Sequence, residues 1–485
     1  MTSFDLIISN AMVVNHDGES KVLQDIGVEN GIITAIETNL EKSNSKKVID
    51  ATGRFAYPGA VDAHQHWGIY NPLEQDTVSE SKACAQGGIT TAITYMRTGM
   101  YYLNKGGSYL NFFPEVLSLC QNRAYVDYGF HLAPMTKQHI SEIPEIISQF
   151  GVSSFKIFMF YGSHGLHGRS ADQSSFLMIP ADEQYNLAHF EFVMRGIQKA
   201  REKFGDRADQ ISLGLHCETA EIMSAYTKII EESGQYKGLE AYHHSRPPHS
   251  EGLAITIASY LAHETRLSNI NLLHLSSFKA VDAAMRMAQA FPHINFRREV
   301  TVGHLLADIH NSPGVGGKVN PPLRPREDVE ALWDFIGKGE LDWIVSDHAC
   351  CKDEFKFGVP KDDVFLAKSG FGGAEYLLPG VISEGRKRGL SRSRIAQLTS
   401  KNPADRYGLK NKGSLSVGFD ADIALVDETQ NYVVRANESE SAQEYTPFEG
   451  FTLTAKVTDT FMRGHHILEN GHIVGSPHGK YQYRS

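Results

Sequence analysis

The chain has 485 residues, of which 41% are hydrophobic and 21% charged, with a formal net charge of -10. This composition is typical of a globular protein, and a negative charge without any basic run argues against nucleic acid or an anionic membrane as the main partner. No stretch reaches the roughly 18 apolar residues of a membrane span, no secretory signal opens the chain, and five irregularly spaced cysteines suit a reducing compartment, so we expect a cytoplasmic protein.

The two ends of the chain share one pattern. Residues 4–55 alternate β-prone runs with Asn-Gly and Asp-Gly turns, as in "DIGVENGIITAI", which is typical of hairpins in a small antiparallel sheet. The same pattern returns after residue 413, for example in "NGHIVG". We predict that residues 1–56 and 405–485 together form a composite β-sandwich domain.

The middle of the chain, residues 57–404, repeats an apolar β-prone run, a polar or Gly-rich loop and a longer helical stretch. Eight such runs end near His66, Met96, Leu132, Phe160, His216, Leu275, Thr301 and Asp347. Alternating strands and helices imply parallel strands with right-handed crossovers, and eight of them predict a (β/α)8 TIM barrel. The alternative is an open doubly wound sheet, although no G-x-G-x-x-G follows the first run.

Four of these runs end in residues of the kind that bind metal ions. In "VDAHQHW", His64 and His66 stand two residues apart and therefore face the same side of a strand. His216 and His274 end two later runs, and Asp347 ends the last one. A lone His-x-His is often a surface or core feature, but such residues at corresponding ends of four runs indicate a metal site. Distant strands bring their ends together only if the sheet closes, so the metal site and the barrel support each other.

Lys156 lies within the apolar run "SFKIFMF", where a charged amine is costly unless it is neutralised or paired. The residues alone leave two interpretations open. Lys156 either pairs with an acid or extends its charge to the mouth of the barrel, or it is a neutral amine that captures carbon dioxide. The resulting carbamate would bridge two metal ions.

The ordered set of these six residues resembles the amidohydrolase superfamily, and more narrowly its cyclic amidases: hydantoinase, dihydropyrimidinase, allantoinase and dihydroorotase. The likeness covers nearly the whole chain, in motifs such as "GGITT" at 87–91, "KVNPPLR" at 318–324 and "GFDADI" at 418–423. It implies two divalent metal ions, with zinc expected. His64, His66 and Asp347 would bind one ion and His216 and His274 the other, with carbamylated Lys156 and a hydroxide between them.

The resemblance also implies roles for residues around the metals. Asp347 would act as general base and then general acid, and Tyr161 would hydrogen-bond the tetrahedral oxyanion. Substrate contacts are expected at Asn320, Trp67 and Ser369. Arg97 ends the second run where near relatives carry uncharged residues, and we expect it to face the pocket and bind an anionic or carbonyl-rich substituent. The alternative is a surface arginine paired with an acid.

The expected reaction is hydrolysis of a C–N bond in a cyclic amide, imide or ureide, hydantoinase-like or dihydropyrimidinase-like, with allantoinase as an alternative. Dihydroorotases carry an arginine where this chain has Gly68, which argues against dihydroorotate. A non-catalytic scaffold would have lost the metal ligands, and a mononuclear deaminase would not need Lys156. Relatives lead us to expect a homodimer or homotetramer, and the loop at 161–184, with His164, His167 and Arg169, is a candidate lid.

Overall fold

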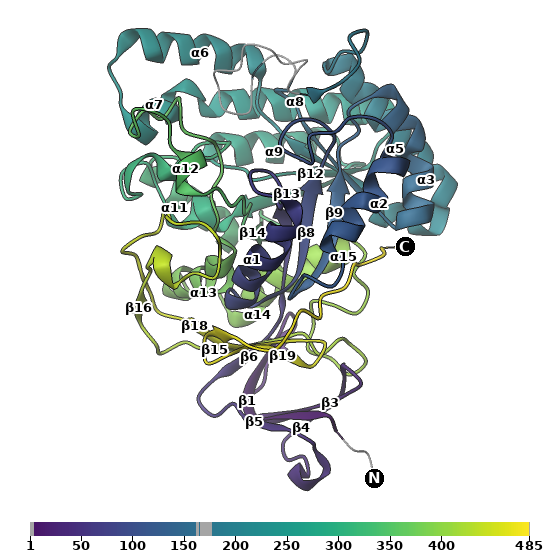
Figure 1. Ribbon diagram of the computed structural model, residues 1–485, viewed down its shortest axis with the longest axis vertical. Helices are drawn as coiled ribbons and strands as arrows, with labels where there is room; N and C mark the ends of the chain where they lie inside the picture. Colours follow the sequence, from purple (N-terminus) through teal and green to yellow (C-terminus); the bar gives the residue numbers. More distant parts are fainter. Residues whose placement is uncertain (1–3, 162–163, 165–176, 485) are drawn as a thin grey trace.

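The computed structural model describes residues 4–161, 164 and 177–484. Its upper part in Figure 1 is built around a sheet of eight parallel strands in the order β14-β13-β12-β11-β10-β9-β8-β7. The strands are β7 (Ala60–Gln65), β8 (Ile89–Met96), β9 (Asp127–Leu132), β10 (Ser154–Phe158), β11 (Ser212–His216), β12 (Asn269–Leu272), β13 (Asn295–Thr301) and β14 (Trp343–Val345). Each of the eight predicted runs is therefore a strand.

The sheet closes between its first and last strands. Gln65 and His348 form a parallel bridge, and the backbone N–H of His66 donates to the carbonyl of His348 at 2.8 Å. The Asp62 carboxylate strengthens this seam, because it accepts a hydrogen bond from the backbone N–H of Ser346 at 3.1 Å. The fold is the predicted (β/α)8 TIM barrel, and the open doubly wound alternative is wrong.

Helices surround the strands (Figure 1). The long ones are α1 (Leu73–Gln86), α2 (Tyr109–Cys120), α3 (Lys137–Phe150), α5 (Leu187–Phe204), α6 (Ala220–Ser233), α8 (Pro248–Thr265), α9 (Phe278–Ala290), α11 (Arg326–Gly337) and α13 (Leu377–Lys387). Several begin at a side-chain cap; the Thr136 hydroxyl, for example, accepts from the N–H of His139. Helix α3 buries Ile143, Ile146 and Ile147 on one face, which is the spacing of an amphipathic helix packed on a sheet.

A β-sandwich built from both termini lies below the barrel in Figure 1. Its ten-stranded sheet has the order β20-β19-β18-β15-β6-β1-β3-β4, with β2 and β5 paired to β1. The strands are β1 (Leu6–Asn15), β2 (Gly18–Glu19), β3 (Gln24–Glu29), β4 (Ile32–Glu37), β5 (Val48–Asp50), β6 (Phe55–Pro58), β15 (Ile423–Asp427), β18 (Lys456–Met462), β19 (His465–Glu469) and β20 (His472–Ile473). Strands β6 and β15 pair directly and join the two ends of the chain. The exact boundaries at 56/57 and 404/405 stay a prediction.

The sheet of the sandwich is mixed, whereas an antiparallel sheet was predicted. Strand β1 is antiparallel to β3 but parallel to β5 and β6. The predicted hairpin between β3 and β4 exists, and its turn places Asn30 and Gly31 at φ values of 52° and 80°. The loop of residues 38–47 then carries the chain back toward the start of β1, so β5 runs in the same direction as β1.

The end of the chain returns from the sandwich to the barrel. Tyr481 forms a parallel bridge with Tyr128 of β9, and the buried Arg484 donates from Nη1 to the Ser154 hydroxyl at 2.7 Å. Ser154 is the first residue of β10, so this tail packs at the amino ends of the barrel strands, opposite the ends that carry the predicted ligands.

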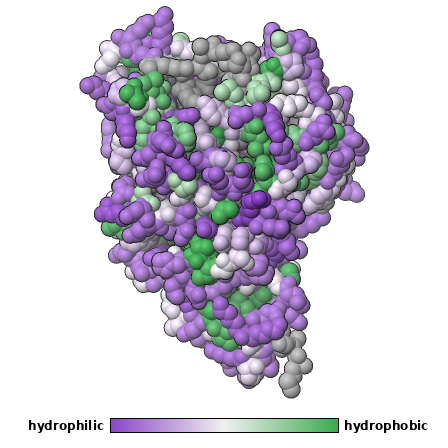
Figure 2. Space-filling view, viewed as in Figure 1, coloured by the Kyte–Doolittle hydropathy of each residue, from purple (hydrophilic) through white to green (hydrophobic). Residues whose placement is uncertain are grey.

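Hydrophilic residues predominate on the face drawn in Figure 2, with hydrophobic residues in scattered patches. Among the described residues, no helix combines the length and apolarity needed to cross a membrane. All five cysteines are buried free thiols.

Candidate active site

Five of the six predicted ligands lie at or just beyond the carboxyl ends of four barrel strands. The sixth, Lys156, lies within a fifth strand. His64 lies in β7 and His66 follows it, Lys156 lies in β10, and His216 ends β11. His274 and Asp347 each follow a strand by two residues. All six side chains are buried. This is the face on which TIM-barrel enzymes carry their active sites.

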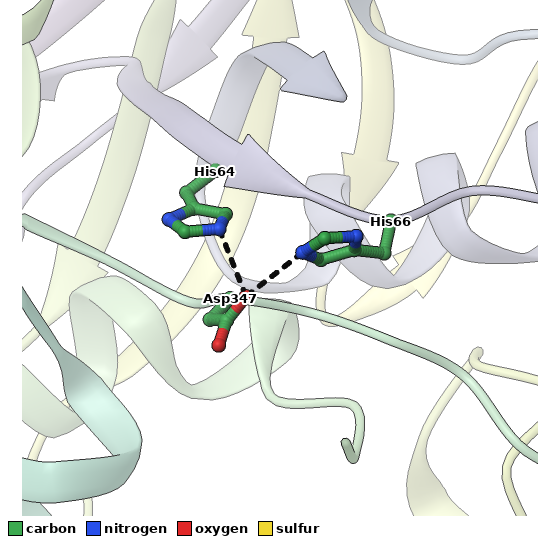
Figure 3. A group of neighbouring side chains, drawn as sticks. All are labelled: His64, His66 and Asp347. Atoms are coloured by element: carbon green, nitrogen blue, oxygen red, sulfur yellow. Dashed lines mark ion pairs between the residues drawn. The ribbon is translucent and has the colours of Figure 1, made fainter. Parts of the chain in front are cut away.

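His64, His66 and Asp347 form a compact group (Figure 3). The Asp347 Oδ1 atom lies 3.1 Å from the Nε2 atoms of both histidines. The Lys156 Nζ atom lies 2.5 Å from His64 Nε2 and 3.4 Å from His66 Nε2. One donor atom from each of His64, His66 and Asp347 falls within 4.8 Å of the others, which is the spacing of ligands around one metal ion.

His216 and His274 form a second group beside the first. Their ring centroids are 4.2 Å apart, and the His274 ring is 5.4 Å from that of His64. Within the described part of the chain, Nδ1 of His216 and both ring nitrogens of His274 have no hydrogen-bond partner although they are buried. A buried polar atom without a partner costs about 1–3 kcal/mol. These nitrogens therefore fit a second metal ion.

The protonation states suit metal binding. Burial lowers the pKa of His216, and lowers those of His64, His66 and His274 well below the usual value, so all four imidazoles keep a lone pair at neutral pH. Burial likewise lowers the pKa of Lys156 to about 8. Of the two interpretations of Lys156, its complete burial beside two imidazole nitrogens favours the neutral amine.

Three ligand histidines are fixed through their second ring nitrogen. Nδ1 of His64 contacts Glu299 Oε1 at 2.7 Å, and Nδ1 of His66 contacts the Tyr102 hydroxyl at 2.8 Å. His216 uses the opposite nitrogen, because its Nε2 lies 2.6 Å from Glu218 Oε2. Each contact determines which ring nitrogen faces the metal site.

Glu218 is itself held by a buried arginine. Arg246 donates to both carboxylate oxygens, from Nε at 2.9 Å and from Nη2 at 2.6 Å. The Arg246 Nη1 atom also donates to the Tyr242 hydroxyl at 3.0 Å, and that hydroxyl donates to Asn320 Oδ1 at 2.5 Å. One hydrogen-bonded chain thus joins a ligand histidine to a predicted substrate contact.

The Glu218→Gln variant should bind its metals about 10–100-fold more weakly, because the neutral amide no longer orients His216 as strongly and leaves Arg246 without a counter-charge. Chelator competition followed by metal analysis measures this. Glu251→Gln is the matched control, since Glu251 forms an equally buried pair with Arg324 at 2.6 Å without touching a ligand histidine. Equal losses of metal affinity in the two variants would contradict the role of Glu218.

A cavity opens above the ligands. Lys156, His66, His216, His274 and Asp347 form its floor, together with the predicted residues Tyr161, Asn320 and Ser369 in its wall. Two tyrosines that the sequence did not suggest, Tyr70 and Tyr102, also line it.

Trp67 does not lie at this cavity. Its side chain has no exposed surface, and its indole N–H donates to Gln65 Oε1 at 2.6 Å. Gln65 ends β7 and faces the side of the strand opposite to His64, so this hydrogen bond holds the indole on the side away from that ligand. Trp67 therefore belongs to the core between the barrel and its helices and not to the substrate site.

Arg97 is also fully buried, which excludes the surface interpretation. It is not among the residues that line the cavity. Its guanidinium carbon lies 5.1 Å from the ring centre of Tyr102 and 5.5 Å from that of Tyr161, two residues that do line it. The predicted direct contact between Arg97 and a substrate does not match this position.

The loop at 161–184 is described only in part. His164 is buried and lies 3.2 Å from the Ser224 hydroxyl through Nδ1. His167 and Arg169 lie outside the described residues. A lid function for this loop stays a prediction.

Comparison with known proteins agrees with the geometry. The model of the amidohydrolase family matches residues 196–467. Allantoinases from Salmonella choleraesuis and Rubrobacter xylanophilus are 30% and 29% identical to the chain, over 99% of its length and 98% of theirs. The crystal structure of dihydropyrimidinase from Brevibacillus agri is similar with a TM-score of 0.84 and 25% identity, covering 99% of this chain and 98% of the other. The chain belongs to the amidohydrolase family.

Proposed function

We propose that this protein is a hydrolase with two metal ions that opens a C–N bond in a cyclic amide, ureide or imide. The observation that carries this proposal is the buried Lys156, which contacts His64 and His66 and lines one cavity with His216 and His274. His64, His66 and Asp347 would hold one ion, His216 and His274 the other, and Lys156 both of them as a carbamate. The nitrogen and oxygen donors suit zinc.

When bound, such a metal pair acidifies water and polarises the scissile carbonyl. Asp347 takes the proton of the attacking water and delivers it to the leaving ring nitrogen, which is general base and then general acid catalysis. Tyr161, in the cavity wall, donates its O–H to the carbonyl oxygen as negative charge develops there. The Tyr242 hydroxyl contacts the side chains of both Asn320 and Ser369 and would hold them in place. Asn320 and Ser369 would then contact the amide edge of the substrate ring.

The wall of the cavity favours a ring without a negative charge. Apart from the ligand residues, the described side chains that line it carry no formal charge: Ile69, Tyr70, Tyr102, Phe158, Tyr161, Val319, Asn320, Ala349, Ser369 and Gly370. A carboxylate-bearing ring such as dihydroorotate finds no cationic side chain among these residues. Allantoin is a specific second candidate, because the two relatives compared above are allantoinases.

A substrate panel tests the proposal. Hydantoin, dihydrouracil, allantoin, dihydroorotate and a cyclic imide are incubated with zinc-loaded enzyme, and the products are identified by mass spectrometry. We expect ring opening of a neutral member without release of ammonia, and no turnover of dihydroorotate. Release of ammonia without ring opening would indicate a deaminase. A purified chain with well below one metal ion, inactive even with added zinc, would indicate a scaffold.

We further propose a cytoplasmic enzyme that forms a homodimer or homotetramer. Light scattering of the purified protein measures its assembly, and fractionation of the native cells measures its location.

A further inference from the structure

Glu299 is a buried acidic residue that contacts both groups of ligand residues. It lies in β13, and its side chain has no exposed surface. Its Oε1 atom lies 2.7 Å from Nδ1 of His64 and accepts a hydrogen bond from the backbone N–H of His274 at 3.2 Å. His64 belongs to the first group and His274 to the second. One oxygen atom therefore contacts a ligand residue of each proposed metal ion.

The other oxygen of Glu299 is held from the neighbouring strand. Trp343 is the first residue of β14 and lies opposite Glu299 in the register of the two strands. Its indole N–H donates to Glu299 Oε2 at 2.8 Å. Because both oxygens make hydrogen bonds, the carboxylate has little freedom to rotate, and the position of Oε1 between the two histidines is fixed.

The contact with His64 determines which ring nitrogen carries the proton. Burial raises the pKa of Glu299 against the N–H hydrogen bonds that it accepts, and a cation bound nearby would favour the carboxylate. A carboxylate only accepts hydrogen bonds, so the proton of the neutral His64 imidazole lies on Nδ1. The lone pair is then on Nε2, which lies 3.1 Å from Asp347 Oδ1 and 2.5 Å from the Lys156 amine.

The contact with His274 acts on the backbone instead of the ring. Among the described residues, both ring nitrogens of His274 lack a hydrogen-bond partner, so its ring is not oriented in the way that the other three ligand histidines are. The backbone of His274 has a φ of 36°, in the left-handed region that residues with a side chain seldom adopt. Such a conformation persists only where surrounding contacts maintain it, and the hydrogen bond to Glu299 is one of them.

We propose that Glu299 is a positioning residue shared by the two metal groups, which sets the tautomer of His64 and the backbone of His274 at the same time. This inference rests on the proposed function with two metal ions. Its consequence is that a change at Glu299 alters the binding of both ions together.

The Glu299→Gln variant keeps the size of the side chain but offers one oxygen where the carboxylate offers two. Three N–H donors surround this group, those of His64, His274 and Trp343. The NH2 of the amide is itself a donor, so it faces at least one of these donors and cannot hydrogen-bond to it. A second change, Trp343→Phe, removes one donor, and the amide can then turn its oxygen toward both histidines.

A metal titration tests the proposal. Metal-depleted wild type, Glu299→Gln, Trp343→Phe and the double variant are titrated with Co²⁺ in the presence of carbon dioxide, and bound ions are counted by visible absorption and metal analysis. We expect two ions per chain in the wild type and in Trp343→Phe. Both dissociation constants should rise about 10–100-fold in Glu299→Gln, and both should recover in part in the double variant. Glu251→Gln, the control used above for Glu218, should bind both ions as the wild type does.

The shared role of Glu299 would be overturned by a Glu299→Gln variant that binds both ions as tightly as the wild type, or that loses affinity for only one. A double variant that binds metal no better than Glu299→Gln would also contradict it, because the loss would then arise from packing and not from the donors. A wild type that binds fewer than two ions would instead refute the proposed function and this inference with it. If circular dichroism shows that Glu299→Gln is unfolded, Glu299→Asp is titrated with the same expectation, since it keeps the charge but withdraws the oxygens by one methylene.

Discussion

The Lys156→Ala variant is expected to lose more than about 100-fold in kcat/KM and to hold less metal than the wild type. Removing a proposed metal ligand should cost more activity than replacing a residue that only orients a ligand. The Lys156 amine lies 2.5 Å from His64 Nε2 and lines the floor of the cavity. Its removal takes away the group that would connect the two metals. Steady-state kinetics and metal analysis of the same preparation measure both effects, and intact mass spectrometry of the wild type under carbon dioxide locates the adduct.

Lys356 is the matched control. It is equally buried, and burial lowers its pKa to about 7, but its Nζ donates to the carbonyls of Gly370 and Lys318 at 2.6 and 3.1 Å. We expect Lys356→Ala to keep its metal and Lys356 to carry no adduct. Equal metal loss in the two variants would show that Lys156 matters only for packing.

The reaction of Lys156 with carbon dioxide should depend on pH. Only the neutral amine reacts, and because burial lowers the pKa of Lys156 to about 8, a larger share of the amine is neutral at about pH 8.5 than at about pH 6.5. Reactivation of metal-depleted enzyme by zinc should therefore become faster as the pH rises across this range, with dissolved carbon dioxide held constant. A rate that is independent of pH would argue against carbamylation.

The Asp347→Asn variant is expected to lose about 100–10,000-fold in kcat, the contribution of general acid–base catalysis, while retaining much of its metal. An amide oxygen can still face His64 and His66 from the position of Oδ1, 3.1 Å from each, but it cannot accept a proton. Rates measured at saturating substrate, with metal content determined in parallel, separate these two functions of Asp347.

Asp342→Asn is the matched control, because Asp342 precedes the same strand that Asp347 follows. Asp342 pairs with Arg297 and Arg298 at 2.9 and 3.2 Å, far from the ligands along the strand. Its replacement should lower thermal stability and leave kcat within about twofold of the wild type. A loss of only a few-fold in Asp347→Asn would mean that another group carries the proton.

Much of the barrel could be predicted from sequence because its strands are buried on both sides and stand out as apolar runs between polar loops. The contrast between apolar runs and polar loops also made five ligands recognisable, because each is a polar residue at the point where an apolar run ends: His64, His66, His216, His274 and Asp347. Lys156 was conspicuous for the opposite reason, as a charge inside such a run. The position of a ligand along its strand was therefore predictable wherever burial of the strand produced a clear apolar run.

Side-chain direction and distant partners were harder to predict. Trp67 was expected at the substrate, but it lies two residues beyond the end of β7, and a hydrogen bond to Gln65 Oε1 sets the direction of its ring. Arg97 was placed at the correct strand end, but its burial behind Tyr102 and Tyr161 depends on segments that are not next to it in sequence. Glu218, two residues after His216, offered a local signal. Tyr102 lies in a loop and Tyr242 in the short helix α7 (Gly238–Ser245), and no pattern in the sequence indicates that either approaches the site.

The seam of the barrel bears on how the protein is made. Asp62 and Ser346, joined across it, are 284 residues apart in sequence, and His66 meets His348 at the same place. During synthesis from the N-terminus, His64 and His66 leave the ribosome long before Asp347 exists, so the three-residue group cannot form on a nascent chain that stops short of the eighth strand. Contacts of such large sequence separation form late and slowly. Tight retention of metal would accordingly distinguish finished molecules from truncated ones.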